Sequence, residues 1–361
     1  MSPSQKRTVW IIIVLLVIGI AYAHWRQRSS VSSSDTIKIG ILAPLTGPGA
    51  VFGNSLVNGV KLAQEDMKNT KHRYELVIED DGTNPAQSSS GAQKLINVDK
   101  VKALITVTSG TGSAAAPIAD AGKVVHFCVC SAIKVGYGTY NFTNSLLPDD
   151  EAGGWVKEAQ KHGVKKVAIL SQIQPGIDAI VNALKPQAEA AGIKVVYAER
   201  FESNNRDFQT ILSKAKQSNP DIYFVISFPP SLDILGQEIK NFDLGKPIST
   251  AAAFGLSATP ALFEGYWYTD AALSDTPFQN RFEMAFPGVR FNVRAAPSGY
   301  DSYRLLVQGF ESGNDIATYV QNLTEYDGET GHVTRAPGSN NFRAPPGLWI
   351  IKNGKATAFQ D

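Results

Sequence analysis

The chain has 361 residues, of which 43% are hydrophobic and 19% charged, a composition typical of a folded protein with room for two domains. The formal net charge is +1, and past residue 35 it becomes −2, because 30 basic residues stand against 32 acidic ones. This balance leaves no basic stripe for phosphates and argues against nucleic acid as a partner. Two cysteines are too few for a disulfide framework.

The first 35 residues predict an export segment rather than a part of the fold. Two basic residues precede an uncharged apolar run over 9–23 that ends in small residues, which is the layout of a secretory signal. At about 1.5 Å per residue the run covers ~22 Å, short of a bilayer core of roughly 30 Å. A Ser-rich tether follows over 28–34. We therefore expect an exported, extracytoplasmic protein, either anchored in the membrane by residues 9–25 or released after cleavage near Ala23.

From residue 36 onward, short apolar β-branched runs alternate with amphipathic stretches. The stretches over 56–67 and 177–188 place apolar residues on one helical face. This alternation predicts parallel sheets covered by helices on both faces, and the number of units favours two α/β lobes. The expected strands are 37–42, 74–79, 102–108, 124–130, 166–171, 194–200, 221–227 and 248–254.

Polar residues follow the third expected strand, where a helix begins. The spacing Gly110-x-Gly112-x-x-Ala115 matches a dinucleotide fingerprint, but it follows the third strand rather than the first, and no acid ends the next strand. Free N–H groups at this helix N-terminus, with the hydroxyls of Ser109, Thr111 and Ser113, instead predict a site for a carboxylate or another anion. A helix capped by its own Ser or Thr is the alternative.

The sequence offers no catalytic motif. Residues 255–259 fail the last position of G-x-S-x-G, and neither H-E-x-x-H nor a P-loop is found. Asp80 and Asp81 end a strand at a turn, so a capping role is favoured over a metal site. Cys128 and Cys130 could hold Cu(I), but two small buried residues on one strand face are favoured. We expect no enzymatic activity, no cofactor and no metal.

A series of short motifs runs in order through residues 36–361. It opens with Thr36-Ile-Lys-Ile-Gly-Ile-Leu-Ala-Pro-Leu-Thr-Gly-Pro48 and Phe52-Gly53. The later motifs are Glu79-Asp-Asp81, Thr108-Ser-Gly110, Lys166-Val-Ala-Ile-Leu170, Gly299-Tyr-Asp301, Tyr326-Asp-Gly-Glu-Thr-Gly331 and Ile350-Ile-Lys-Asn-Gly354. This ordered set resembles the type I periplasmic solute-binding proteins, in the branch that binds leucine, isoleucine and valine for ABC importers.

The resemblance implies two Rossmann-like α/β lobes with parallel sheets, joined by three crossovers and closing on a ligand. Lobe one is expected at 36–144 with 270–328, and lobe two at 145–269 with 329–361. The implied role is a monomeric, non-enzymatic binding protein that captures a small molecule and presents it to an ABC permease. A ligand-sensing receptor domain of the same fold is the alternative.

The same resemblance implies where the ligand binds. In the family, the Ser of the T-S-G turn and a hydroxyl residue after the next strand hold the ligand carboxylate, and an aromatic of the first loop packs on the ligand. The positions implied here are Phe52, Ser109, Gly110, Thr111, Ser131, Ala132, Pro175 and Phe254.

Lobe two departs from the family pattern where the amino group of a ligand would bind. The amino-acid binders of the family place an acid after a later strand, whereas this chain has no acid between Asp243 and Glu264. An ammonium buried without a partner costs several kcal/mol. We therefore expect a carboxylate, an amide or an aromatic acid rather than an ordinary α-amino acid.

Overall fold

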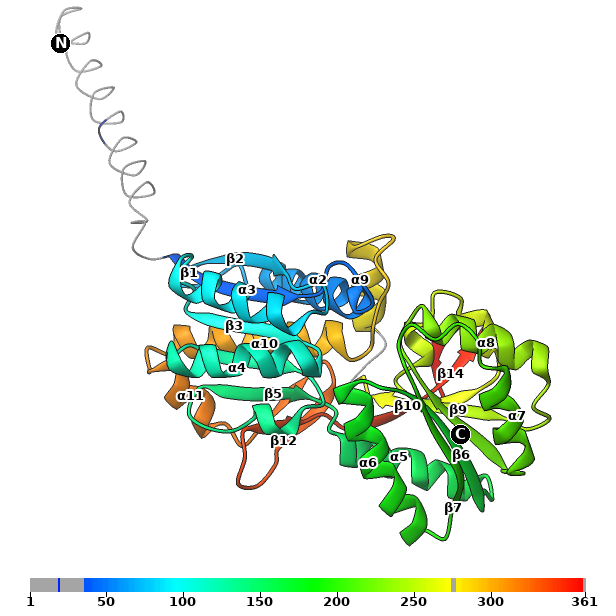
Figure 1. Ribbon diagram of the computed structural model, residues 1–361. Helices are drawn as coiled ribbons and strands as arrows, with labels where there is room; N and C mark the ends of the chain where they lie inside the picture. The colour runs from blue at the N-terminus through cyan, green and yellow to red at the C-terminus, as the bar shows by residue number, and fades with distance from the viewer. Residues whose placement is uncertain (1–18, 20–35, 274–276, 360–361) are drawn as a thin grey trace, which may run out of the picture.

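The computed structural model describes residues 19, 36–273 and 277–359, and the two long ranges form two α/β lobes (Figure 1). The two lobes and their mostly parallel sheets confirm the predicted fold class. The predicted export segment and tether lie outside the described residues, apart from Gly19. Within the described ranges, none of the helices combines the length and the apolar character needed to cross a bilayer.

Lobe one is built on an eight-stranded sheet in the order β11-β12-β13-β5-β4-β3-β1-β2. The strands from β13 to β2 run parallel, and β12 and β11 extend the sheet antiparallel. The bounds are β1 Thr36–Ala43, β2 Arg73–Asp80, β3 Ala103–Val107, β4 Val125–Val129, β5 Asn141–Ser145, β11 Glu325–Gly328, β12 Gly331–Arg335 and β13 Asn341–Arg343.

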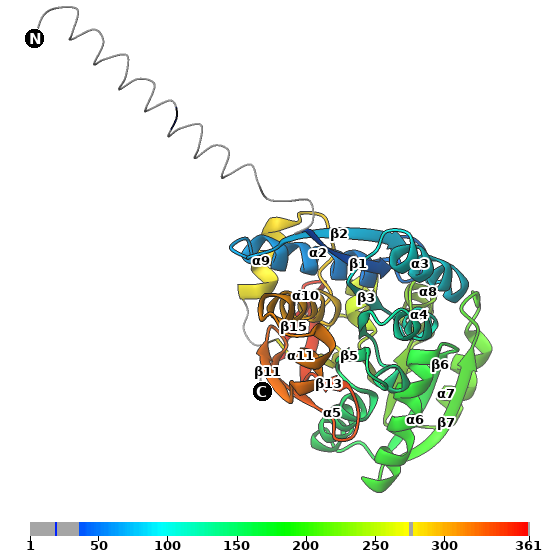
Figure 2. The same ribbon diagram turned by 90° about the vertical axis from the view of Figure 1, so that its left-hand side faces the viewer.

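Helices cover both faces of this sheet. On one face α2 (Ala50–Asp66) and α10 (Ala295–Glu311) pack together over the strands, as Figure 2 also shows. On the other face lie α3 (Pro85–Asn97) and α4 (Ser109–Ala121). Asn84 starts α3 by accepting hydrogen bonds from two backbone N–H groups, with Pro85 in the first helical position. The remaining helices are α9 Pro277–Ala285, α11 Ile316–Asn322 and the short η2 Ile133–Val135.

Lobe two is built on a seven-stranded sheet in the order β15-β14-β10-β9-β8-β6-β7. Its strands are β6 Lys166–Gln172, β7 Lys194–Phe201, β8 Ile222–Ile226, β9 Ile248–Ala251, β10 Trp267–Ala271, β14 Pro346–Lys352 and β15 Lys355–Ala358. Its helices are α5 Pro148–Lys161, α6 Pro175–Ala190, α7 Gln209–Gln217, α8 Ser231–Phe242, η3 Phe254–Leu256 and η4 Pro260–Phe263. Their apolar faces share one core with the sheet, and Trp155 is its largest fully buried side chain.

The described chain passes between the lobes from β5 to α5, from β10 to α9 and from β13 to β14. The third passage lies later than expected. The resemblance predicts residues 329–361 in lobe two, but β12 and β13 belong to the first sheet, because Thr334 pairs with Arg343 and Asn341 pairs with Thr143. The second passage is also later, since β10 keeps residues 270–271 in the second sheet.

Cys128 and Cys130 form a disulfide with each other. The prediction of two unbonded cysteines is therefore wrong. The predicted burial is confirmed, because both cysteines are buried at the end of β4. At the Asp80–Asp81 turn, Asp80 accepts hydrogen bonds from the backbone of Leu45 and Gly82. The two acids hold the turn as expected, but the predicted helix-capping role is wrong, because Asn84 caps the helix that follows.

Candidate functional site

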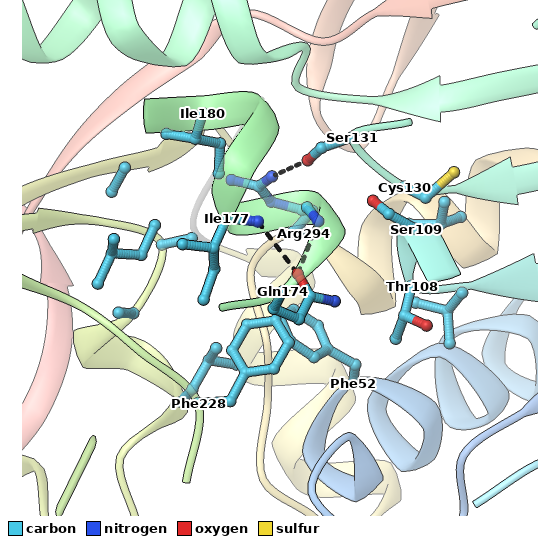
Figure 3. A pocket seen from close by; sticks show the side chains of 18 residues that line it. Phe52, Thr108, Ser109, Cys130, Ser131, Gln174, Ile177, Ile180, Phe228 and Arg294 are labelled. Carbon is cyan, nitrogen blue, oxygen red and sulfur yellow. Dashed lines mark hydrogen bonds between the residues drawn. The ribbon is translucent and has the colours of Figure 1, made fainter. Parts of the chain in front are cut away.

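A cavity of about 50 Å³ lies between the lobes, several times the roughly 10–15 Å³ that one water needs (Figure 3). Residues from both lobes line it, and they sit where β3, β4, β6, β8 and β9 end at their carboxyl ends. This is the edge at which open α/β sheets bind ligands. The lobe-one lining includes Phe52, Thr108, Ser109, Cys130, Ser131 and Arg294, and the lobe-two lining includes Gln174, Gly176, Ile177, Ile180, Phe228 and Ala252.

The start of α4 forms an anion-binding end of this cavity. Thr108 precedes the helix, and its side chain does not cap it, because its hydroxyl is hydrogen-bonded to that of Thr111 at 2.7 Å. The N–H groups of the first helical turn therefore lack a side-chain cap and favour a bound anion. Ser109 is 5% exposed and lines the cavity, so its hydroxyl can join these donors.

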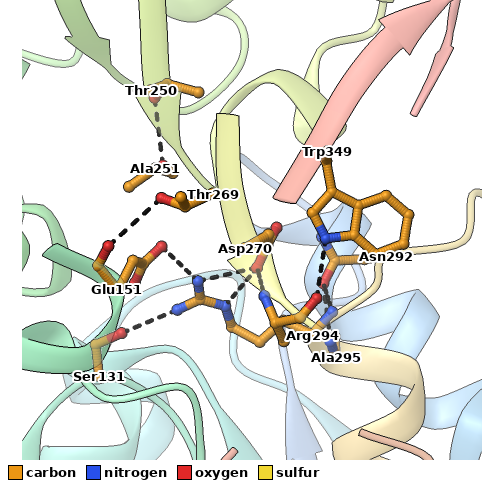
Figure 4. Close-up of polar contacts among 11 residues, drawn as sticks. Ser131, Glu151, Thr250, Ala251, Thr269, Asp270, Asn292, Arg294, Ala295 and Trp349 are labelled. Atoms are coloured by element: carbon orange, nitrogen blue, oxygen red, sulfur yellow. Dashed lines mark hydrogen bonds and ion pairs between the residues drawn. The ribbon is translucent and has the colours of Figure 1, made fainter. Parts of the chain in front are cut away.

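Arg294 brings the charge of the site. It stands at the start of α10, and its Nη1 donates to Ser131 Oγ at 3.3 Å, where both residues line the cavity. On its other side, Nη2 donates to Glu151 Oε1 at 2.6 Å and to Asp270 Oδ1 at 2.9 Å (Figure 4). The two carboxylates hold the pKa of the guanidinium above its ordinary value against the opposing effect of burial. Among the described residues that line the cavity, none is acidic.

The remaining walls are apolar. Phe52 of α2 and Phe228, just after β8, meet edge to face across the two lobes with ring centroids 5.4 Å apart. Ile177 and Ile180 of α6 complete the lobe-two wall (Figure 3). These side chains would enclose a flat or branched apolar group. Each contact with a buried aromatic ring would add to the apolar area removed from water and so to the free energy of binding.

The start of α6 closes the cavity from lobe two. Gln174 Oε1 accepts hydrogen bonds from Gly176 N at 2.6 Å and Ile177 N at 3.0 Å, so this helix is capped by its own sequence. A Cβ at Gly176 would lie 3.0 Å from Ser109 Oγ, which shows how closely the two lobes approach here. Glycine permits this approach because it has no Cβ.

Backbone strain also gathers at the cavity. Thr108 has a φ of 77° and Ala252 a φ of 61°, in the left-handed region that residues with a side chain rarely adopt. One comes from each lobe, and both line the cavity. Strain of this kind is typical of binding sites, where the surrounding fold holds it in place.

The residues predicted from the sequence divide into two groups. Phe52, Ser109 and Ser131 come together in the cavity lining. Thr111 turns its hydroxyl away from the cavity and donates it to the carbonyl of Val107, the last residue of β3, at 2.8 Å. Phe254 is fully buried in the lobe-two core, stacked on Phe263, so its side chain is a core residue and not a wall of the cavity. Gly110, Ala132 and Pro175 lie next to lining residues without lining the cavity themselves.

Sequence reasoning did not find Arg294, Phe228 or Gln174 as site side chains. Arg294 lies in a stretch without a recognisable motif, and Phe228 follows an apolar strand like many core residues. Gln174 carries a weak signal, because a polar residue directly before a proline often starts a helix. These positions become functional candidates only through the meeting of the two lobes.

Comparison with known proteins agrees with this architecture. The family model described as periplasmic binding protein matches residues 36–349. A leucine-, isoleucine-, valine-, threonine- and alanine-binding protein of Pseudomonas aeruginosa is 26% identical over 329 residues, covering 87% of this chain and 85% of that protein. A leucine-binding protein of Thermotoga maritima has a similar structure, with a TM-score of 0.80, 21% identity and coverage of 90% of this chain and 98% of that one.

A solute-binding protein of an ABC transporter from Rhodopseudomonas palustris HaA2, in complex with p-hydroxybenzoic acid, is also similar. Its TM-score is 0.78 and its identity 25%, with coverage of 91% of this chain and 96% of that one. The family model covers most of the chain, and the two-lobed fold agrees with both solved structures. The chain therefore belongs to the periplasmic binding protein family, and it is a ligand carrier rather than an enzyme.

Proposed function

We propose that this protein is the extracytoplasmic solute-binding component of an ABC importer, and that its ligand is a small apolar or aromatic monocarboxylate without an amino group. The observation that carries this proposal is the lining of the interlobe cavity. It combines an anion-binding end with apolar walls and, among its described residues, offers no acid.

The carboxylate end is supported by three kinds of donor. The first turn of α4 contributes N–H groups without a side-chain cap, and Ser109 and Ser131 contribute hydroxyls. The guanidinium of Arg294 lies beside Ser131. Hydrogen bonds from such donors to a charged acceptor are the strong class, each contributing about 1.5–3 kcal/mol.

The absence of an acid among the described lining residues argues against a ligand with an α-ammonium group. An ammonium desolvated among Ile177, Ile180 and Phe228 has no carboxylate to pair with in the lining. The cost of several kcal/mol is larger than a single good hydrogen bond can return. A ligand that lacks the amino group avoids this cost and still uses the carboxylate end.

The apolar walls favour a flat or branched body for the ligand. Phe52 and Phe228 form an edge-to-face pair at 5.4 Å, a geometry that accommodates another ring or a branched chain. The similar Rhodopseudomonas palustris protein, whose structure contains p-hydroxybenzoic acid, supports an aromatic acid as the first ligand to test.

The experiment is a thermal-shift and calorimetry panel on the purified protein. It pairs benzoate with benzamide and 4-methylpentanoate with leucine, so that each pair differs in one group. A ligand at 100 times its Kd adds about 2.7 kcal/mol to stability, which is easily detected. We expect the two acids to bind and leucine to bind at least tenfold more weakly. Binding of leucine without binding of the acids would refute the ligand class.

The proposal also covers the cellular location and the oligomeric state of the protein. The family and the apolar start of the sequence support an exported protein that acts outside the cytoplasm. We further expect this protein to be a monomer. Intact-mass analysis of the natural protein distinguishes cleavage near Ala23 from retention of residues 9–25 as an anchor. Light scattering tests the monomer.

A further inference from the structure

Arg294, Glu151 and Asp270 form a buried charge cluster where the lobes join, and this cluster carries more negative than positive charge. The side chains are 7%, 0% and 1% exposed, respectively. Arg294 comes from the start of α10, Glu151 from the first turn of α5 and Asp270 from β10 (Figure 4). With both carboxylates ionised, one guanidinium faces two negative charges.

The two carboxylates are only partly satisfied. Glu151 Oε2 and Asp270 Oδ2 are buried and have no hydrogen-bond partner among the described residues. A buried ionised oxygen without a donor is costly, whereas a protonated carboxyl group is much less so. The cluster is therefore poised to accept a proton.

The other charged groups around Glu151 do not relieve this excess. On its own helix, Asp150 is paired with Arg343 of β13. Asp149 adds further negative charge to the same helical turn. Helix α6 packs along α5, and its Asp178 is paired with Arg200. The elements packed on α5 carry three further charged side chains, Lys185, Glu189 and Lys352. None of the three forms an ion pair with Glu151 in the described structure.

The opposite side of Arg294 faces the cavity. Its Nη1 reaches Ser131 Oγ at 3.3 Å, and both side chains belong to the lining (Figure 3). A ligand carboxylate held by Ser131 and the start of α4 would thus meet the same guanidinium that Glu151 and Asp270 share. A third negative charge at one buried cation is strongly unfavourable, because Coulomb repulsion is poorly screened away from water.

We propose that the protein binds an anionic ligand together with a proton, which passes from solvent to a carboxylate oxygen of Glu151. The guanidinium of Arg294 is then shared between the ligand and Asp270. The net charge of the cluster is −1 before binding, and it is still −1 after binding when the ligand carboxylate is counted with it. In this role Glu151 is a positioning residue, since it acts on the ligand through Arg294. This inference rests on the proposed function.

The electrostatics of the ligand-free protein fit this coupling. Burial raises the pKa of Glu151 to about 7, with Arg294 opposing the rise and the charge of Asp270 adding to it. Glu151 is therefore largely ionised above pH 7 in the absence of ligand. A bound anion raises this pKa further, so binding at pH 7.5–8 draws a proton from the buffer.

The test is isothermal calorimetry of the full protein with benzoate at pH 7.5, in phosphate and in Tris. These buffers differ in ionisation enthalpy, so the difference in binding heat counts the protons taken up. We expect on the order of half a proton or more per ligand, and a Kd that rises toward tenfold per pH unit between pH 7 and 8.5. Benzoate itself stays ionised over this range.

Variants assign the proton. Glu151→Gln keeps the size and the acceptor oxygen and is expected to bind with no buffer dependence and a flat pH profile. The matched control is Glu158→Gln, which removes a buried acid of the same helix that pairs with Lys161 and not with Arg294. This control is expected to keep the uptake of the natural protein.

Three results would overturn the inference. Binding of benzoate with equal heats in both buffers shows that no proton is taken up, and it leaves the proposed function intact. Unchanged uptake in Glu151→Gln places the proton elsewhere. Failure of every acid in the panel to bind removes the proposed function, and this inference with it.

Discussion

Replacing Ser109 by alanine is the most direct test of the anion-binding end of the cavity. The side chain is 5% exposed and lines the cavity at the start of α4. It is not the capping residue of that helix, because the cap position is Thr108. Alanine is also a good helix former. We therefore expect Ser109→Ala to leave the free energy of unfolding within about 0.5 kcal/mol of the natural value.

The effect on affinity follows from the hydrogen bond that is lost. A bond from a hydroxyl to a carboxylate contributes about 1.5–3 kcal/mol, so Kd for the acid should rise roughly 10- to 150-fold. The N–H groups of the first turn remain, and binding should weaken without disappearing. Calorimetric titration with benzoate or 4-methylpentanoate measures this change directly.

Thr111→Val is the matched control, because it removes a hydroxyl two residues further along the same helix. That hydroxyl donates to the carbonyl of Val107 and is also hydrogen-bonded to the hydroxyl of Thr108, and Thr111 does not line the cavity. We expect this variant to lose about 0.5–1.5 kcal/mol of stability with less than a twofold change in Kd. The reasoning is refuted if Ser109→Ala binds normally while Thr111→Val loses affinity.

Three further predictions concern the cavity wall, the packing and a buried acid. Phe228→Ala removes the edge-to-face partner of Phe52 and should weaken binding at least severalfold, since such pairs contribute about 0.5–1.5 kcal/mol. Equal affinity in titration would contradict this. Gly59→Ala places a Cβ 2.1 Å from the carbonyl oxygen of Ala296 and should cost about 1–3 kcal/mol in urea unfolding, whereas an unchanged midpoint would show that α2 and α10 separate easily. Burial raises the pKa of Asp301 to about 7. Between these two pKa values the folded state holds a proton that the unfolded state, titrating near pH 4, has released. The protonated Asp301 therefore contributes stability that is complete below about pH 4 and is lost as the pH rises through 7. As the pH rises from 5 to 7.5, the free energy of unfolding of Asp301→Asn should increase relative to that of the natural protein. A difference between the two proteins that does not change with pH would refute the raised pKa of Asp301.

Much of the fold could be predicted from local patterns. Eight of the parallel strands coincide with the runs expected from the sequence, from β1 to β4 and from β6 to β9. The buried face of α6 consists of the residues that the helical period indicated. Short apolar β-branched runs and a 3.6-residue period are properties of neighbouring residues, so a single stretch of sequence is enough to predict them.

Strand β5 shows where local patterns fail. Its sequence Asn141-Phe-Thr-Asn-Ser145 is mostly polar, yet the whole strand is buried. Thr143 donates to Asn341, and Asn144 accepts a hydrogen bond from Tyr326. These partners lie about two hundred residues away in the chain, so nothing near the strand predicts its burial. The late third crossover has the same cause, because β13 is held in the first sheet by pairing with β5.

For the candidate site, the sequence by itself determined the start of α4, with Ser109, and the absence of an acid between Asp243 and Glu264. Both are local facts about the chain. Only the tertiary structure decided that Arg294 joins this site while bound to Glu151 and Asp270. These groups come from different elements and both lobes, and the energy of a buried charge depends on which other charges the fold brings within a few ångströms.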